Sequence, residues 1–345
     1  MRRSTLRFVP GLLLAGLAAC GSSDPSPSSG GLPLIDLGAS TYLNTFQGGL
    51  YPGGVNVVPS VHDSVGRVRA ALIIPRATNG TPNAGGKYVL LSIGMSNTSQ
   101  EWCGVVPTPC NGWTLMGQAA SDGAVNHGTM AIANGAEGGE DAPKWDAPTD
   151  ANYDRVATQV LGPMGLSEEQ VQAVWLKEAN IGPSVSLPSS NADAYLLETS
   201  MGKIVRALKV RYPNLQIVFI SSRIYGGYAT TGRNPEPYAY ETGFAVKWLI
   251  QAQIDQMANG GTVVDTRAGN LNYNGVAPWI VWGPYLWADG TNPRSDGLTW
   301  SIGEFESDGV HPNTTGETKV ANRLLAFFKS SAYASCWFLS GGNCP

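Results

Sequence analysis

The chain has 345 residues, with 22 Lys and Arg against 26 Asp and Glu and a formal net charge of −4 at pH 7. Only 14% of the residues are charged and no basic run stands out, which argues against nucleic acid as a partner. The abundance of Gly, Asn, Ser, Trp and Tyr favours an extracytoplasmic protein that handles neutral or sugar-like ligands.

The first twenty residues have the pattern of an export signal. Three arginines precede an apolar stretch over residues 9–19, which is too short to span a bilayer. The sequence Leu-Ala-Ala-Cys that ends at Cys20 resembles the lipobox at which bacterial lipoprotein precursors are cleaved and lipidated. We therefore predict a lipoprotein signal peptide over 1–19, a lipidated Cys20, a Ser/Pro/Gly tether over 20–31 and a single domain over 32–345. The product would be exported and held at a bacterial membrane by its lipid alone; a frayed N-terminal helix is the alternative.

The remaining cysteines agree with export. They form an even set with two short spacings, Cys103 with Cys110 and Cys336 with Cys344. We favour these two disulfides among the three possible pairings, because each would close a small loop rich in Pro or Gly. Metal binding is the alternative, although no histidine lies near and neither pair has the CxxC spacing.

The domain alternates between apolar runs and helical patterns. Strands are predicted over residues 67–74, 88–93, 129–133, 171–176 and 215–221, with a short one beginning at 263–264. Helices are predicted over 192–211 and 240–257, and a last helix starts with a Thr314–Glu317 capping box. This order predicts an α/β fold of three layers, α/β/α, around a central parallel sheet, preceded by an irregular N-terminal extension. Ligands of such sheets bind where the strands end, so the chemistry is expected there.

Histidine is scarce, which narrows the search for a general base. The chain has only His62, His127 and His311. His311 follows Asp308 by three residues, immediately before the last helix, so that the carboxylate can lie behind the imidazole and fix its tautomer. The alternative is that both residues only shape the entry to the helix.

The candidate nucleophile is Ser96, which lies just past the apolar run 88–93. Gly94 permits the tight turn that would lift the serine Oγ above the edge of the sheet. Ser92 falls inside the run and Ser99 lies further from its end, so neither is favoured. A serine that only hydrogen-bonds its own loop is the structural alternative.

Two later strand ends offer donors for an oxyanion. The Gly-rich segment 134–139 follows the predicted strand 129–133, and Asn180 follows the predicted strand 171–176. Each signal is weak alone, but both occupy the position after successive strands.

In this arrangement the sequence resembles the SGNH (GDSL-like) hydrolase superfamily, whose four landmarks are a Ser, a Gly and an Asn after successive strands and a C-terminal DxxH. The resemblance implies the SGNH/flavodoxin-like fold, Ser96, His311 and Asp308 as a catalytic triad, and oxyanion donors at Ser96, Gly139 and Asn180. It covers about residues 85–330. The first block departs from Gly-Asp-Ser because Met95 replaces the acid, and the third reads Glu-Ala-Asn-Ile instead of Gly-x-Asn-Asp.

Further residues are predicted to shape the substrate pocket, because they follow the predicted strand 215–221 or lie in the Trp-rich segment before the DxxH. They are Arg223, Tyr225, Trp282, Trp287 and Arg294. Aromatic rings can stack on sugars and an arginine can hold a carboxylate or hydroxyl. The alternative is that these side chains pack the loops onto the core.

The sequence thus predicts a serine ester hydrolase that needs no cofactor and no metal and acts on a small-molecule or carbohydrate ester. An acetylated carbohydrate is modestly favoured. A non-catalytic surface lipoprotein that binds glycans through the Trp-rich segment is the alternative, and a metal-dependent hydrolase is a poor third.

Overall fold

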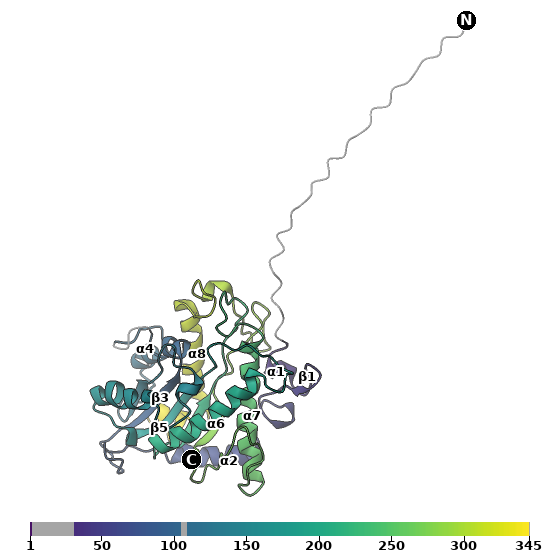
Figure 1. Cartoon of the computed structure of the whole chain (residues 1–345). Coiled ribbons are helices and arrows are strands. Elements are labelled where there is room, and N and C mark those ends of the chain that lie inside the picture. Colours follow the sequence, from purple (N-terminus) through teal and green to yellow (C-terminus); the bar gives the residue numbers. More distant parts are fainter. Residues whose placement is uncertain (2–30, 105–108, 345) are drawn as a thin grey trace.

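The computed structural model of the chain describes residues 1, 31–104 and 109–344. Its centre is a five-stranded parallel sheet in the order β4-β3-β5-β6-β7, and helices flank this sheet on both sides (Figure 1). The predicted three-layer α/β fold is therefore confirmed. Apart from residues 1 and 31, the predicted signal peptide, Cys20 and the predicted tether lie outside the described residues.

The strands are β1 (Thr41–Tyr42), β2 (Phe46–Gln47), β3 (Tyr88–Gly94), β4 (Met130–Asn134), β5 (Val171–Lys177), β6 (Ile217–Ile220) and β7 (Trp279–Trp282). The α-helices are α1 (Leu34–Leu37), α2 (Ser60–Ala71), α3 (Ser96–Trp102), α4 (Leu115–Ser121), α5 (Ala151–Arg155), α6 (Asp193–Arg211), α7 (Tyr238–Ala258), α8 (Thr314–Ser330) and α9 (Ser335–Phe338). Short 3-10 turns lie at Pro52–Gly54, Ala142–Lys144, Gly162–Met164, Glu168–Gln170 and Ile302–Glu304, and a π turn at Val156–Leu161.

Four predicted strands are confirmed as β3, β4, β5 and β6, and all residues of β3, β5 and β6 are buried. Continuous apolar runs identify such strands because both faces of a parallel sheet are covered by helices. The helices predicted over 192–211 and 240–257 correspond to α6 and α7.

Three predictions about local structure were wrong. Residues 67–74 do not form a strand; most of them lie in α2, which buries every fourth residue, His62, Gly66 and Ala70. The fifth strand is β7 rather than Val263–Val264, whose side chains are exposed. The last helix is capped by Asn313, and Glu317 accepts a hydrogen bond from the Trp113 indole instead of closing a capping box.

The N-terminal extension is more regular than predicted. It holds α1 and the β1–β2 hairpin, which lie beside α7 (Figure 1). Tyr42 stacks on Phe244 of α7, and the Lys247 ammonium donates to the carbonyl oxygens of Gln47 and Gly48. The extension is thus packed onto the domain by both ring contacts and hydrogen bonds.

The order of the strands places a site at one end of β3. From β3 the chain passes to β4 on one side and then returns to β5 on the other. Gly94, at the end of β3, pairs with Lys177, at the end of β5. Crevices of parallel sheets open where the connections diverge in this way, beyond the carboxyl ends of the strands.

Both favoured disulfides are present, Cys103–Cys110 and Cys336–Cys344, which removes these four cysteines as metal ligands. Such bonds persist in oxidising compartments and so fit an exported protein. Within residues 31–104 and 109–344, none of the helices combines the length and apolar character needed to cross a membrane.

His62 is expected to make stability depend on pH. Its Nε2 faces the Ile280 carbonyl oxygen at 2.9 Å and its Nδ1 accepts from the Trp279 indole, and burial lowers the pKa of His62 to about 4. Below pH ~6.5 the unfolded state therefore binds a proton at His62, whereas the folded state keeps the ring neutral until about pH 4. The stability that the neutral ring contributes is lost as the pH falls from ~6.5 toward 4. Compared with His62→Gln, the wild type should lose about 3 kcal/mol of unfolding free energy between pH 7 and 4 in urea titrations. An equal pH dependence in both proteins would contradict this.

Candidate active site

Three side chains from distant parts of the sequence meet at the end of β3. The Ser96 Oγ lies 2.8 Å from His311 Nε2, and His311 Nδ1 lies 2.6 Å from Asp308 Oδ2. A carboxylate only accepts hydrogen bonds, so the Nδ1 carries a proton and the Nε2 is free to accept from the serine. The three predicted triad residues thus form one hydrogen-bonded chain.

Local geometry lifts Ser96 to this position. It is the first residue of α3, which begins directly after β3. Gly94 adopts a φ of 157°, and a Cβ there would collide with the Lys177 carbonyl oxygen and the Thr98 hydroxyl. The Thr98 hydroxyl in turn donates to that carbonyl at 2.7 Å. Glycine is therefore required for α3 to turn back this closely over β5.

The loop that carries His311 is held by its own backbone. Asp308 Oδ1 accepts from the N–H groups of Val310 and His311 at 2.9 and 3.0 Å. Gly309 has a φ of 66°, and a Cβ there would collide with the Tyr228 carbonyl oxygen. The Asn97 amide donates to the Val310 carbonyl oxygen at 3.0 Å and so ties the loop to the helix of the serine.

The carboxylate of Asp308 is kept ionised. Partial burial opposes its charge, but the two backbone N–H groups and the His311 ring outweigh this, so the pKa of Asp308 lies below its ordinary value. An ionised Asp308 can hold the imidazole in one tautomer and stabilise the imidazolium.

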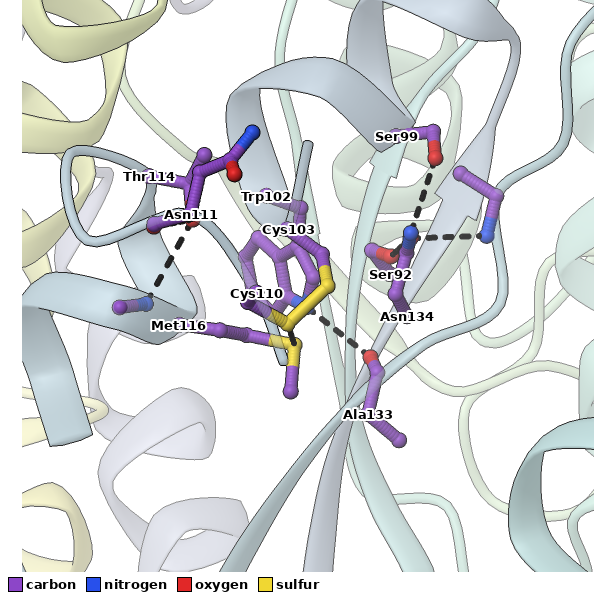
Figure 2. The surroundings of a disulfide bond; sticks show 12 residues. Ser92, Ser99, Trp102, Cys103, Cys110, Asn111, Thr114, Met116, Ala133 and Asn134 are labelled. Atoms are coloured by element: carbon purple, nitrogen blue, oxygen red, sulfur yellow. Dashed lines mark hydrogen bonds between the residues drawn. A yellow bond between two sulfur atoms is a disulfide. The ribbon is translucent and has the colours of Figure 1, made fainter. Parts of the chain in front are cut away.

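The competing nucleophiles have other partners. The Ser92 hydroxyl donates to Asn134 Oδ1 at 2.7 Å, and Ser99 accepts from Asn134 Nδ2 at 2.9 Å (Figure 2). Among the histidines, His62 is buried against β7 and His127 is exposed beside the Asp122 carbonyl oxygen. Only His311 therefore lies against a serine within the described residues.

Two cavities open on either side of Ser96. One, of about 270 Å³, is lined by Met95, Ser96, Asn97, Gly138, Gly139, Ile181, Arg223, Arg233, Asn234, Val310 and His311. We call it the histidine-side cavity. The other, of about 390 Å³, is lined by Ser96, Ser99, Gln100, Gly104, Asn134, Ala136, Glu137, Gly138, Arg155, Gln159 and Val160. We call it the amide-side cavity, because three Asn and Gln side chains line it.

Backbone donors for an oxyanion lie between the cavities. Within the described residues, the N–H groups of Ser96, Gly138 and Gly139 donate to no other protein group. Gly138 lines both cavities, and a Cβ built on it would lie 3.9 Å from the Ser96 Cβ. Gly139 lines only the histidine-side cavity, so Gly138 is the nearer of the two to the nucleophile. The N–H of Gly138 is thus as free as that of the predicted donor Gly139, and the Gly-rich sequence pattern could not distinguish the two residues.

Asn180 is not brought to the serine. Its Nδ2 donates to the Asp193 carbonyl oxygen at 3.3 Å, its carbonyl oxygen accepts from Asn234, and it lines neither cavity. Glu178, two residues earlier, is buried, and burial raises its pKa well above the ordinary value. The predicted oxyanion role of Asn180 therefore finds no support in this geometry.

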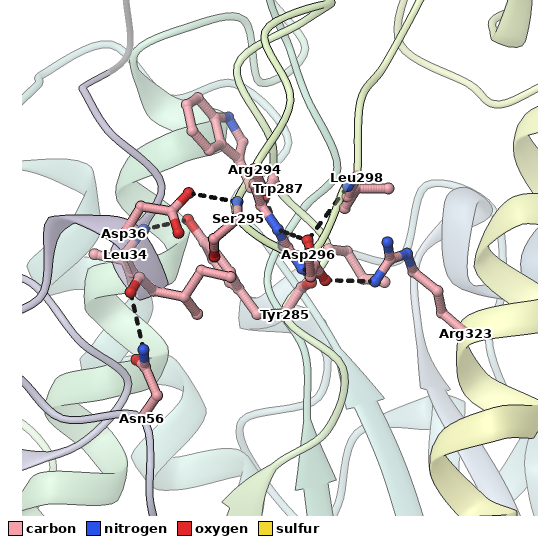
Figure 3. A network of polar contacts seen from close by, with 12 residues as sticks. Leu34, Asp36, Asn56, Tyr285, Trp287, Arg294, Ser295, Asp296, Leu298 and Arg323 are labelled. Carbon is pink, nitrogen blue, oxygen red and sulfur yellow. Dashed lines mark hydrogen bonds and ion pairs between the residues drawn. The ribbon is translucent and has the colours of Figure 1, made fainter.

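Among the predicted pocket residues, only Arg223 lines a cavity beside Ser96. Trp282 donates its indole N–H to the Leu50 carbonyl oxygen, Trp287 donates to the buried Glu236, and Tyr225 packs edge-on against Tyr228. The side chain of Arg294 donates to the carbonyl oxygens of Tyr285 and Trp287 and to Asp296, which also binds Arg323 (Figure 3). These four residues pack loops onto the core, as the alternative interpretation held.

Sequence reasoning missed other residues of the histidine-side cavity, namely Asn97, Ile181, Arg233 and Asn234. Asn97 stands next to the serine, but its hydrogen bond to the His311 loop needs a contact across more than two hundred residues. Arg233 and Asn234 lie in a long loop between β6 and α7 with no periodic pattern. No signal in one sequence places such a loop over a particular strand end.

A buried ion pair lies beneath the site. Lys177, the last residue of β5, contacts both carboxylate oxygens of Glu101 on α3 at 2.5 Å, and both side chains are at most 1% exposed. Burial raises the pKa of Glu101 and lowers the pKa of Lys177 to about 8, and their attraction offsets part of both shifts. The pair connects the helix of the nucleophile to the neighbouring strand. Outside the segments left undescribed, no three His, Cys, Asp or Glu side chains are grouped as a metal site would require.

Comparison with protein-family models and with curated protein sequences finds no match to this chain. Its structure is similar to that of a protein from Arabidopsis thaliana, with 11% identity, a TM-score of 0.37 and coverage of 71% of this chain and 98% of that chain. It is also similar to an extracellular lipase from Streptomyces rimosus, with 14% identity, a TM-score of 0.30 and coverage of 69% and 99%. A family two carbohydrate esterase from Clostridium thermocellum matches with 15% identity, a TM-score of 0.35 and coverage of 70% and 63%. At these scores the chemistry of the site has to be inferred from its own geometry.

Proposed function

We propose that the chain is a serine ester hydrolase that works through an acyl-enzyme, with Ser96 as nucleophile, His311 as general base and acid, and Asp308 as its partner. The observation that carries the proposal is the hydrogen-bonded chain from Ser96 through His311 to Asp308, at 2.8 and 2.6 Å, between two cavities. A nucleophile, its base and a group that orients the base are the parts that acyl transfer requires.

The reaction proceeds in two halves. His311 Nε2 takes the Ser96 proton as the Oγ attacks the ester carbonyl, and the N–H groups of Ser96 and Gly138 or Gly139 face the oxyanion that forms. The tetrahedral intermediate then expels the alcohol, which receives its proton from His311. Water, deprotonated by the same ring, attacks the acyl-serine, and the acid leaves as Ser96 recovers its proton.

The two cavities divide the substrate. His311 must lie next to the oxygen of the leaving alcohol, and it lines only the histidine-side cavity. The alcohol part therefore occupies that cavity, and a small acyl group such as acetyl turns toward the amide-side cavity. We further propose that the enzyme is exported and lipid-anchored at Cys20 and meets small or carbohydrate esters outside the cytoplasm.

A fluorophosphonate probe tests the nucleophile directly, because it phosphonylates an activated serine and releases fluoride. The wild type should be labelled at Ser96, Ser99→Ala should be labelled to a similar extent, and Ser96→Ala should not be labelled. Mass spectrometry of the labelled peptide identifies the site. Undiminished labelling of folded Ser96→Ala would overturn the assignment, and undiminished ester turnover after chelation would dispose of a metal-dependent reaction.

A non-catalytic glycan-binding protein is the second candidate, and its sequence support has weakened. That idea placed the glycan on the Trp-rich segment, but Trp282 and Trp287 in it are buried and their indole N–H groups are occupied. Folded wild type that fails to react with the probe would restore it.

A further inference from the structure

Arg223 is placed beside the nucleophile by the strand that precedes it. It follows β6 by three residues and its backbone N–H donates to the Thr242 hydroxyl on α7 at 3.1 Å. The residue is only 4% exposed, yet it lines the histidine-side cavity together with Ser96 and His311. Its position is therefore fixed by the core while its side chain borders the site.

The guanidinium of Arg223 has no direct partner within the part of the chain that the structure describes. Within residues 31–104 and 109–344, its Nε is enclosed without a hydrogen bond, and no carboxylate lies within ion-pair distance of the guanidinium. Burial lowers its pKa, and the more distant carboxylates of Glu101, Glu236 and Asp308 only partly offset this. A buried cation with unused donors is costly unless something fills them.

Arg294 shows what this chain does with a buried arginine that serves structure. It is 5% exposed, and its side chain reaches two carbonyl oxygens and both oxygens of Asp296. Arg223 is buried to the same extent without any such contact. The difference indicates that the donors of Arg223 are kept for a ligand.

The lining of the histidine-side cavity has the charge that such a ligand requires. Among the residues that the structure describes, it includes a second arginine, the exposed Arg233, and no Asp or Glu. This cationic cavity belongs to a chain whose net charge is −4. An anionic group entering it would meet two guanidiniums, while the Asp308 carboxylate lies behind His311 and is not part of the lining.

We propose that Arg223, assisted by Arg233, binds a carboxylate on the alcohol part of the ester, so that the substrate is an acylated hydroxy acid or an acylated acidic sugar. The planar fork of a guanidinium matches a carboxylate through two parallel hydrogen bonds. The alcohol part is assigned because His311, which protonates the leaving oxygen, lines the same cavity. This inference rests on the proposed function.

Matched aryl acetates test the proposal on the intact protein. The acidic probes are 3- and 4-acetoxybenzoate, and the neutral controls are the corresponding acetoxybenzamides, which have the same size and also leave through a phenolic oxygen. We expect the wild type to have the higher kcat/KM for the acidic ester of at least one pair. Arg223→Gln should lower kcat/KM for that ester by about 10- to 100-fold and change the neutral one by less than about 3-fold, because only the acidic ester uses the charged hydrogen bonds.

Two further variants grade the effect. Arg223→Lys keeps the charge without the fork and should recover part of the preference. Arg233→Gln changes an exposed residue and should lower the preference for the acidic ester by about 2- to 5-fold. This decrease should be smaller at high salt. Arg67→Gln, on α2, removes one positive charge at a residue that lines neither cavity and should leave the preference unchanged.

The outcomes separate the inference from the proposed function. Equal turnover of acidic and neutral esters by the wild type would overturn the carboxylate site but leave the esterase standing. An equal loss on both esters in Arg223→Gln would assign Arg223 to the oxyanion or to the fold and overturn the proposal. If the wild type hydrolysed none of these esters, the proposed function itself would be contradicted. Should Arg223→Gln not fold, competitive inhibition of the wild type by 3- or 4-hydroxybenzoate but not by the hydroxybenzamides still decides the question.

Discussion

Ser96→Ala is expected to lower kcat for p-nitrophenyl acetate by about 10⁴- to 10⁶-fold, and adding His311→Ala to that variant should cost little more. The reason is the hydrogen bond of 2.8 Å that joins the serine Oγ to the imidazole, which makes the two side chains one working unit. Without the Oγ there is no proton for His311 to take, so the second deletion removes nothing that still functions. Single and double variants should be compared at saturating substrate.

The control is Ser99→Ala. Ser99 lies on the same helix as Ser96, but its hydroxyl binds Asn134 rather than a histidine. The variant should retain turnover within about 3-fold, since the hydrogen bond it loses is neutral and partly exposed. If the losses of Ser96→Ala and His311→Ala multiplied in the double variant, the two residues would act independently and the relay would be wrong. Thermal unfolding should show that all four proteins remain folded.

The sequence was most informative where chemistry and topology coincide. Ser96, Asp308 and His311 could be named because a strand end, a glycine turn and a scarce histidine each restrict the choice. Their mutual distances agree with that interpretation, although the reaction itself stays a proposal. The central sheet could be predicted because buried parallel strands read as continuous apolar runs.

Helix α2 and strand β7 show why other elements of the fold could not be predicted from the sequence. The stretch that starts at Arg67 looks apolar in a short window, but it lies within a helix whose buried residues recur every fourth position. The strand Trp279–Trp282 spans four residues, and its aromatics suggested a ligand platform instead. Periodicity distinguishes neither case over so few residues.

The cavity residues depended on tertiary contacts that one sequence does not contain. The overall composition favoured neutral ligands, yet the described lining beside His311 holds Arg223 and Arg233 and no Asp or Glu. Composition averages over the whole chain, whereas recognition depends on a dozen side chains that the fold gathers. Trp287 and Arg294 were misread because their burial depends on how the segments fold together. Trp287 donates to the Glu236 carboxylate on another segment, and Arg294 donates to the carbonyl oxygens of Tyr285 and Trp287 in its own.

Lys177→Met is expected to lower the free energy of unfolding by about 3–5 kcal/mol, because it leaves the Glu101 carboxylate buried without its partner. Both side chains are at most 1% exposed, so water cannot replace the lost ammonium. An unpaired Glu101 would bind a proton in the folded state. Its folded pKa would then lie above the unfolded one, and stability would be lost as pH rises through the unfolded value of ~4.3 toward the folded value. Urea unfolding at pH 5 and pH 8 should therefore show the larger deficit at pH 8.

The double variant Lys177→Met/Glu101→Gln distinguishes the pair from mere packing. The neutral amide introduced by Glu101→Gln would need no counter-charge, so most of the loss in unfolding free energy should be recovered and its pH dependence should vanish. Removing both charges of a buried pair costs far less than removing one.

Lys203→Met is the matched surface control. Its ammonium also contacts a carboxylate, Asp146 at 2.9 Å, but the lysine side chain is 49% exposed, and its loss should cost less than about 1 kcal/mol. Equal costs for the two lysine variants would mean that the pair beneath Ser96 contributes no more than a surface contact. A much larger cost for Lys177→Met than for Lys203→Met would instead identify the Glu101–Lys177 pair as the contact that holds the helix of the nucleophile on the sheet.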